Sequence, residues 1–211
     1  MKALLMKALI SIMFLTGILL LFSNSLQNKA IENGSEKLLE NDFTEDSEDI
    51  EASFDFQEVQ SLNMQDVIQA QLKRKDFKVI GSIAIPDVSL ELPIGKGVAE
   101  YIIALGAGTM KPDQQLGQGN YALASHYFDG KDILFGPLHD IELGSIAYVS
   151  DLHRIYEYKI TVKETILDSS VHVIYDTPDQ TLLTLITCAE QGTKRLLVQG
   201  ELVKSYPINK T

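Results

Sequence analysis

The chain lacks the residues and motifs on which several common kinds of site depend. Its 211 residues include one cysteine and no tryptophan, which excludes an intramolecular disulfide framework and a zinc site built from several cysteines. It contains no glycine-rich phosphate-binding loop, no dinucleotide fingerprint and no HExxH helix. The formal net charge of −11 argues against nucleic acid as a partner.

Most of the excess negative charge lies in one strip of the sequence. Residues 32–58 contain eleven acids and one lysine, whereas residues 59–211 contain eighteen acids and fourteen bases. Residues 23–62 hold few large apolar side chains, so they cannot bury enough surface to offset the entropy lost when a backbone is fixed. We therefore expect residues 23–62 to form an acidic, flexible stalk.

An apolar run precedes this strip. No charged residue occurs from Ala8 to Phe22, and Lys2 and Lys7 lie before or at the start of the run. With the apolar residues before Lys7, the stretch approaches the roughly 20 residues that a membrane-spanning helix needs. We expect residues 1–22 to be an uncleaved single-pass anchor, with a cleaved signal peptide as the alternative. The flanking lysines predict a cytoplasmic N-terminus and an extracellular remainder.

Residues 63–211 carry the patterns of a folded domain. A helix is predicted from Met64 to about Phe77, because apolar residues share one face at helical spacing: Met64, Val67, Ile68 and Leu72. Runs typical of short strands follow: Val79–Ile85, Val88–Leu92, Asn120–His126, Ile146–Val149, Ile155–Val162, Val171–Tyr175, Leu182–Cys188 and Leu196–Val203. This pattern predicts a mainly β fold, an antiparallel-rich barrel or sandwich of about 150 residues.

Cys188 is the first candidate for chemistry. It stands where the apolar run 182–188 gives way to a polar loop, so a rigid strand holds its backbone while the thiol is partly exposed. A buried structural thiol is the alternative interpretation. A nucleophilic thiol needs a base or a cation nearby.

His126 and Arg195 are the candidate partners of this thiol. His126 ends a predicted strand among small residues, and Arg195 begins the strand after Cys188, so a hairpin brings the guanidinium close to the thiol. A metal site of His126, Asp129 and Asp132 is conceivable, but the spacing matches no strong ligand pattern. An ordinary surface position is the alternative for each of the two partners.

These residues carry a resemblance to a known family. Thr184–Cys188 (TLITC) resembles the TLxTC signature of sortases, and Asn120–His126 (NYALASH) is similar to the histidine segment of the class A members. Arg195 matches the family's arginine. Further segments resemble the streptococcal-type enzymes: Val79–Pro86, Leu92–Ile94 and Gly106–Lys111.

The resemblance implies an eight-stranded sortase β-barrel with short helices over residues 63–211. Some class A members bind calcium, but the acids that do so cannot be located in this sequence, so we assign no metal and no cofactor. It implies a membrane-anchored cysteine transpeptidase of a Gram-positive surface. Such an enzyme cleaves LPxTG surface proteins between Thr and Gly and passes them to an amine of the peptidoglycan precursor, lipid II. Cys188 is then the nucleophile, His126 the general acid and base, and Arg195 the oxyanion and substrate stabiliser. By analogy, four further residues shape the substrate groove: Ala122, Ala124, Ser125 and Thr187.

Two other functions stay open on the sequence. A secreted thiol hydrolase could use the same three residues on another fold, without passing the acyl group to an amine. A surface-anchored binding module would use none of them. A short polar C-terminus and the absence of a lid segment before the barrel favour class A over the pilin-type sortases.

Overall fold

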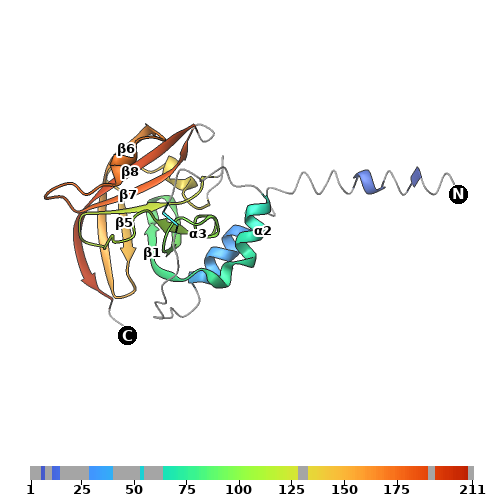
Figure 1. The fold of residues 1–211 in the computed structure, drawn as a ribbon, viewed down its shortest axis with the longest axis horizontal. Helices are drawn as coiled ribbons and strands as arrows, with labels where there is room; N and C mark the ends of the chain where they lie inside the picture. The colour runs from blue at the N-terminus through green and yellow to red at the C-terminus, as the bar shows by residue number, and fades with distance from the viewer. Residues whose placement is uncertain are drawn as a thin grey trace.

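A computed structural model describes residues 6–7, 11–14, 29–39, 53–54, 64–127, 133–189 and 193–208. The described residues form a closed barrel in the strand order β1-β2-β3-β4-β7-β8-β6-β5 (Figure 1). The strands are β1 Val79–Ile85, β2 Leu90–Gly95, β3 Ala107–Thr109, β4 Asn120–Ala124, β5 Ile146–Ser150, β6 Arg154–Leu167, β7 Leu182–Ala189 and β8 Lys194–Pro207. The mainly β, eight-stranded barrel that the sequence predicts is confirmed.

Two of the eight strand contacts are parallel, those of β2 with β3 and of β4 with β7. The other six are antiparallel, and the longest joins β6 to β8 from Arg154↔Pro207 to Leu167↔Lys194. Short helices precede or connect the strands: α2 Met64–Leu72 and η2 Arg74–Asp76 come before β1, and η3 Pro86–Val88, α3 Glu100–Ile103, η4 Gly136–His139 and η5 Val171–Ile174 lie between strands.

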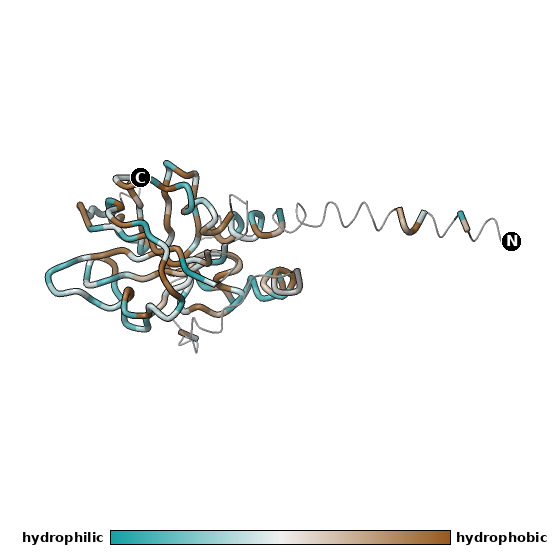
Figure 2. The backbone as a smooth tube through the Cα atoms, turned by 90° about the horizontal axis from the view of Figure 1, so that it is seen from above, coloured by the Kyte–Doolittle hydropathy of each residue, from teal (hydrophilic) through white to brown (hydrophobic). Residues whose placement is uncertain are grey.

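Alternating side chains fill the barrel. In β1 every second residue from Gly81 to Ile85 is buried, as the two-residue period of a strand requires. The interior cluster takes Leu183 and Leu185 from β7 and Val198 from β8, and hydrophobic stretches gather on the central strands (Figure 2). A second cluster lies on the opposite face of β4, β7 and β8, where Ile174 of η5 covers it.

Two local predictions are wrong. Residues 171–174 form the 3₁₀ helix η5 and not a strand. Asn120 Nδ2 donates to the carbonyl of Val173 in this helix and to that of Tyr175 directly after it, and such tertiary contacts override local β propensity. Strand β3 was not predicted, because its sequence AGT lacks the large apolar residues that mark a strand. It is nonetheless buried between β2 and β4.

The predicted helix at the start of the domain is shorter, and only part of its predicted apolar face is buried. It ends at Leu72 as α2, and Arg74–Asp76 continues as 3₁₀ helix. Of the predicted apolar face, Val67 is buried, but Ile68 and Leu72 are exposed, and Ala70 is buried as well.

The prediction of a flexible stalk is wrong for residues 29–39, which are helical and lie beside α2 (Figure 1). Ile31 and Leu38 of this helix are 1% and 5% exposed, and Ser35 Oγ donates to the carbonyl of Leu105 at 2.6 Å. Gln71 Nε2 donates to the carbonyl of Ala30 at 2.6 Å. Residues 29–39 contain few apolar residues, but these share one helical face and pack together against the domain. The segment is therefore ordered despite its low apolar content.

This packing predicts that a chain starting at residue 59 is less stable than one starting at Ser23. Each fully buried aliphatic side chain contributes about 1.5–3 kcal/mol, so losing Ile31 and Leu38 together should cost several kcal/mol. Urea unfolding of the two soluble chains measures the difference. A chain starting at Lys29 is the matched control and should unfold like the Ser23 chain; coincident midpoints for all three would show that the helix contributes nothing.

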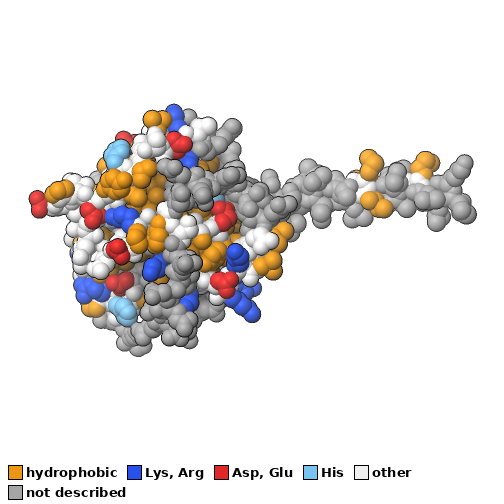
Figure 3. Space-filling view, viewed as in Figure 1, with side chains coloured by type: hydrophobic (Ala, Val, Ile, Leu, Met, Phe, Trp, Pro, Cys, Tyr) orange, Lys and Arg blue, Asp and Glu red, His pale blue; other side chains and the backbone are white. Residues whose placement is uncertain are grey.

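No helix within the described residues is long and apolar enough to cross a membrane. The predicted anchor falls mostly on residues 1–5, 8–10 and 15–22, which lie outside the described residues, as does most of the remaining predicted stalk. On the face of the barrel shown in Figure 3, acidic and basic side chains are interspersed. This mixture agrees with the nearly balanced charge of residues 59–211.

Candidate active site

The parallel pairing of β4 with β7 brings His126 and Cys188 to one edge of the barrel. The register runs from Asn120↔Leu182 to Ala124↔Ile186. His126 and Cys188 each lie two residues beyond the last pair, so both follow it toward the same edge of the barrel. The amide of Ser125 donates to the carbonyl of Ile186 at 3.3 Å and carries the pairing past the end of β4.

Arg195 joins this edge from β8. Cys188 and Arg195 are direct partners in the antiparallel β7–β8 pair, so their side chains leave the sheet on the same side. Two more rows continue behind on that face, first Ala124, Ile186 and Leu197, then Ala122, Thr184 and Gln199. Three adjacent strands thus bring together the three residues that the sequence singles out.

His126 is almost fully buried, with 1% of its surface exposed. Its backbone is fixed on both sides, because its amide donates to Ile103 and its carbonyl accepts from Phe135. Its Nε2 lies 2.8 Å from Oε1 of Glu100, the first residue of α3. The imidazole therefore has a defined orientation before any substrate arrives.

The Cys188 thiol is half-buried. Burial raises the pKa of this thiol above its ordinary value; the Arg195 charge acts to lower it, and Glu100 adds to the rise. At neutral pH the Cys188 side chain is therefore mostly protonated. Arg195 is itself 9% exposed and donates to the carbonyl of Lys194 at 3.2 Å, which holds its guanidinium near the strand end.

The four residues predicted to shape the groove are all buried. Ala122 and Ala124 belong to the cluster under η5. Ser125 Oγ donates to the carbonyls of Gly106 and Ile103, and Thr187 Oγ1 donates to the carbonyl of Ser125 at 2.9 Å. Ser125 and Thr187 therefore hold the ends of β4 and β7 together, and a contact of any of the four with substrate stays a prediction.

A pocket of about 470 Å³ opens on the same face of the barrel. Ile186 and Arg195 line it from the sheet, and Ile174 with residues 166–171 lines it from the β6–η5 connection. Phe54 also lines this pocket, and the carbonyl of Ser53 accepts from the amide of Val98 at 2.7 Å. Residues 53–54 therefore also contact the folded domain, unlike the flexible stalk that the sequence predicts. The pocket beside Arg195 can accommodate an extended, largely apolar chain.

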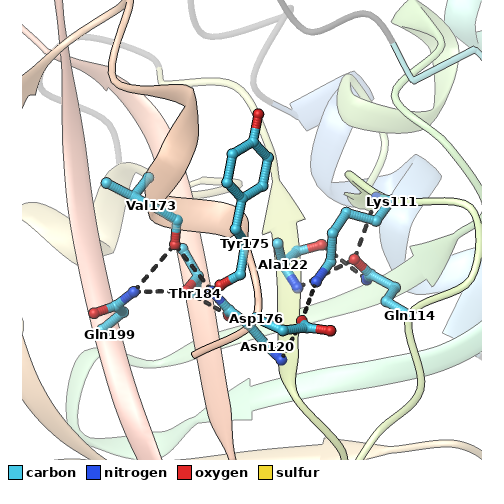
Figure 4. Close-up of polar contacts among 9 residues, drawn as sticks. All are labelled: Lys111, Gln114, Asn120, Ala122, Val173, Tyr175, Asp176, Thr184 and Gln199. Carbon is cyan, nitrogen blue, oxygen red and sulfur yellow. Dashed lines mark hydrogen bonds and ion pairs between the residues drawn. The ribbon is translucent and has the colours of Figure 1, made fainter. Parts of the chain in front are cut away.

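A polar network fixes the wall of this pocket (Figure 4). Asn120, which is buried, donates to the carbonyls of Val173 and Tyr175. Thr184 Oγ1 donates to Asn120 Oδ1 at 2.7 Å and accepts from Gln199 Nε2 at 3.0 Å. These hydrogen bonds attach segment 173–175 to the sheet at Thr184 and Gln199.

Asp176 attaches the same segment a second time. Its carboxylate accepts from the backbone N–H of Asn120 at 2.9 Å and from Lys111 Nζ at 2.6 Å (Figure 4). These contacts, the lysine first, lower the pKa of Asp176. The ion pair is largely exposed, so we expect it to orient the segment and to add little stability.

The network predicts that Thr184→Val destabilises the protein although the shapes match. The change leaves Asn120 Oδ1 without its donor in a buried site, which costs about 1–3 kcal/mol. Thermal and urea unfolding measure the loss, and Thr165→Val on the exposed part of β6 is the matched control. An unchanged midpoint in Thr184→Val would show that the network carries no stability.

The sequence does not mark one residue of this region. Glu100 contacts His126, but it lies 26 positions away with no local motif to mark it. His139, assigned no role above, has Nε2 at 3.4 Å from the carbonyl of Cys188, and its ring lies 4.3 Å from that of Tyr127. Asp129 and Asp132, from the conceivable metal site, lie outside the described residues, and the described residues contain no group of three metal-ligating side chains.

The arrangement suits acyl transfer. It offers a thiol nucleophile, an imidazole able to move protons, and a guanidinium with several donors at the same edge. The apolar rows and the pocket lie next to these groups, where they can exclude water from an acyl intermediate. The same residues have no evident use in a module that only binds.

Comparisons with known proteins agree with this geometry. A family model described as the sortase domain matches residues 83–203. The chain is 36% identical to sortase A of Streptococcus agalactiae serotype III over 207 residues, covering 93% of this chain and 84% of that protein. It is 36% identical to sortase A of Listeria monocytogenes over 211 residues, covering 97% and 94%. The crystal structure of the Listeria monocytogenes enzyme superposes with a TM-score of 0.60 at 40% identity, covering 63% of this chain and 92% of that one.

Proposed function

Since the chain belongs to the sortase family of cysteine transpeptidases, which act on surface proteins, we propose that it cleaves LPxTG-type sorting signals between Thr and Gly. The released surface protein is passed to an amine of the peptidoglycan precursor, lipid II. The observation that supports the proposal is that Cys188 of β7 pairs with Arg195 of β8, and that His126 follows the end of β4, the parallel neighbour of β7.

The proposed reaction has two halves. The Cys188 thiolate attacks the Thr carbonyl, and Arg195 donates to the developing oxyanion. His126 as imidazolium gives its proton to the Gly nitrogen as the C–N bond breaks, which leaves a thioester on Cys188. His126 then takes a proton from the incoming amine, whose nitrogen displaces the sulfur. The pocket beside Arg195 is our candidate for the part of the signal before the scissile bond.

The placement of the enzyme belongs to the same proposal. Residues 1–22 anchor it as a single span, with the N-terminus in the cytoplasm and the barrel outside a Gram-positive cell. The uncharged run from Ala8 to Phe22 supports this, as do Lys2 and Lys7. Protease added to intact protoplasts should release a barrel-sized fragment; protection until lysis would reverse the orientation.

One assay tests the proposed reaction. Full-length protein in detergent is mixed with a quenched LPxTG peptide, with and without an oligoglycine amine, and the products are weighed by mass spectrometry. Ligated product that appears only with the amine and is absent in Cys188→Ala supports the proposal. Free acid alone would indicate a thiol hydrolase, and an intact peptide would indicate a binding module.

A further inference from the structure

We propose that Glu100 is a positioning residue of this site: its carboxylate accepts the Nε2–H of His126 and leaves Nδ1 as the nitrogen that exchanges protons with the amines. The inference rests on the proposed function, because it gives His126 the general acid and base role. It adds a residue that the sequence does not mark and assigns the proton transfer to a particular atom.

The first support is the contact itself. Glu100 Oε1 lies 2.8 Å from Nε2, and the imidazole is buried while the Glu100 side chain is 43% exposed. A carboxylate can only accept, so the proton of this hydrogen bond lies on Nε2. In neutral His126 the lone pair is then on Nδ1. A buried imidazole without such a partner could take either tautomer, and one of the two would present the wrong nitrogen.

The second support is that both ends of the contact are held by the fold. Glu100 opens α3, whose residue Ile103 accepts from the amide of His126 and from Ser125 Oγ. Ile103 also packs in the cluster with Ala124 and Ile186. Helix and strand end therefore form one unit, and the distance between carboxylate and imidazole does not depend on loop motion.

The third support is that Glu100 acts on Cys188 as well. Its charge adds to the rise in the pKa of the thiol, after the larger effects of burial and of Arg195. Within the part of the chain that the structure describes, other titratable side chains of this region are Arg195 from β8, His126 from the end of β4 and His139 from η4. Among these, Glu100 supplies negative charge. Removing that charge should favour the thiolate while it releases the imidazole.

The balance of the two steps follows from the assigned atom. In the first half, the imidazolium proton on Nδ1 moves to the Gly nitrogen, and the electron pair of the broken C–N bond stays on that nitrogen. In the second half, the Nδ1 lone pair accepts a proton from the attacking amine, and the sulfur leaves as thiolate. The proton on Nε2 stays with the Glu100 contact throughout.

The test compares Glu100→Gln, His126→Ala and the double variant with the wild-type chain in the peptide and amine assay. We expect Glu100→Gln to lower kcat by at least about tenfold, less than the 10²–10⁴-fold that loss of a general acid and base costs. Since Glu100 acts through His126, adding Glu100→Gln to His126→Ala should cost nothing further. Glu142→Gln, an exposed acid in the turn before β5, is the matched control and should keep full activity.

Two readouts separate positioning from general damage. Imidazole ¹⁵N shifts should place the neutral-state proton of His126 on Nε2 in the wild type. Glu100→Gln should weaken that preference, because the glutamine amide can donate to Nε2 as well as accept from it. Iodoacetamide should alkylate Cys188 severalfold faster in Glu100→Gln at neutral pH, because the pKa of the thiol falls, although turnover is slower.

The possible failures are distinguishable. Equal losses from Glu100→Gln in both backgrounds, or a proton on Nδ1 in the wild type, would overturn the positioning role. Near-normal turnover in His126→Ala would instead overturn the proposed function, and the ¹⁵N shifts would still report on the Glu100 contact.

Discussion

Arg195→Lys should lower kcat of the peptide reaction by on the order of 10²–10³-fold, the cost of losing a preorganised oxyanion donor. Arg195 lies opposite Cys188 on β8, where a planar guanidinium can donate to an oxyanion and a peptide carbonyl together. Lysine keeps the charge but offers a mobile, strongly hydrated point donor. The loss should therefore appear mostly in kcat.

Alkylation kinetics separate the two possible tasks of Arg195. Its charge lowers the pKa of Cys188, so Arg195→Gln should raise that pKa and slow iodoacetamide at neutral pH. Arg195→Lys should alkylate at a near-normal rate, because the charge remains. Full turnover in Arg195→Lys would remove the oxyanion role. A collapse of its alkylation rate would assign Arg195 to thiolate stabilisation alone.

His126→Ala should lower turnover by about 10²–10⁴-fold, because both halves of the reaction need a proton carrier at the strand end. The comparison that matters is His139→Ala, since the structure places this second ring against the carbonyl of Cys188. That contact is long and reaches a backbone atom, so we expect His139→Ala to cost little beyond stability. Both variants are compared at equal folded concentration by circular dichroism and peptide turnover.

The outcome for His139 decides which imidazole serves the thiol. His153 and His172 lie on exposed parts of the described chain and provide a baseline for the loss of any histidine. Equal loss of turnover in His126→Ala and His139→Ala would mean that the strand-end assignment is wrong or incomplete.

The sequence predicted the parts of the fold whose local pattern and tertiary environment agree. Buried and less buried residues alternate in strand β1, and its predicted bounds, Val79–Ile85, agree with the observed ones. Strand β3 and helix η5 were missed because their positions depend on partners far along the chain, Gly95 and Asn120 among them. The helix at 29–39 was missed for the opposite reason, because an acidic average hid the apolar face that carries Ile31 and Leu38.

The candidate site was predictable where residue type is informative. A lone cysteine at a strand end and an arginine at the start of the next strand imply a hairpin pair, which the β7–β8 register shows. Glu100 could not be found in this way. Its role arises from the contact of a short helix with the end of β4, and acids on exposed helix starts are common in any sequence.

The parallel pairing of β4 and β7 also determines when the active site can form during synthesis and folding. Asn120 and Leu182 are partners 62 positions apart in the chain, and β5 and β6 both lie between them in the sequence. Closing a loop of this length costs chain entropy before any contact repays it, so such pairings tend to form late. A chain that is still being synthesised carries His126 well before Cys188. The thiol can meet its imidazole only after nearly the whole barrel has been synthesised, so that an unfinished enzyme has no means of cutting its substrates.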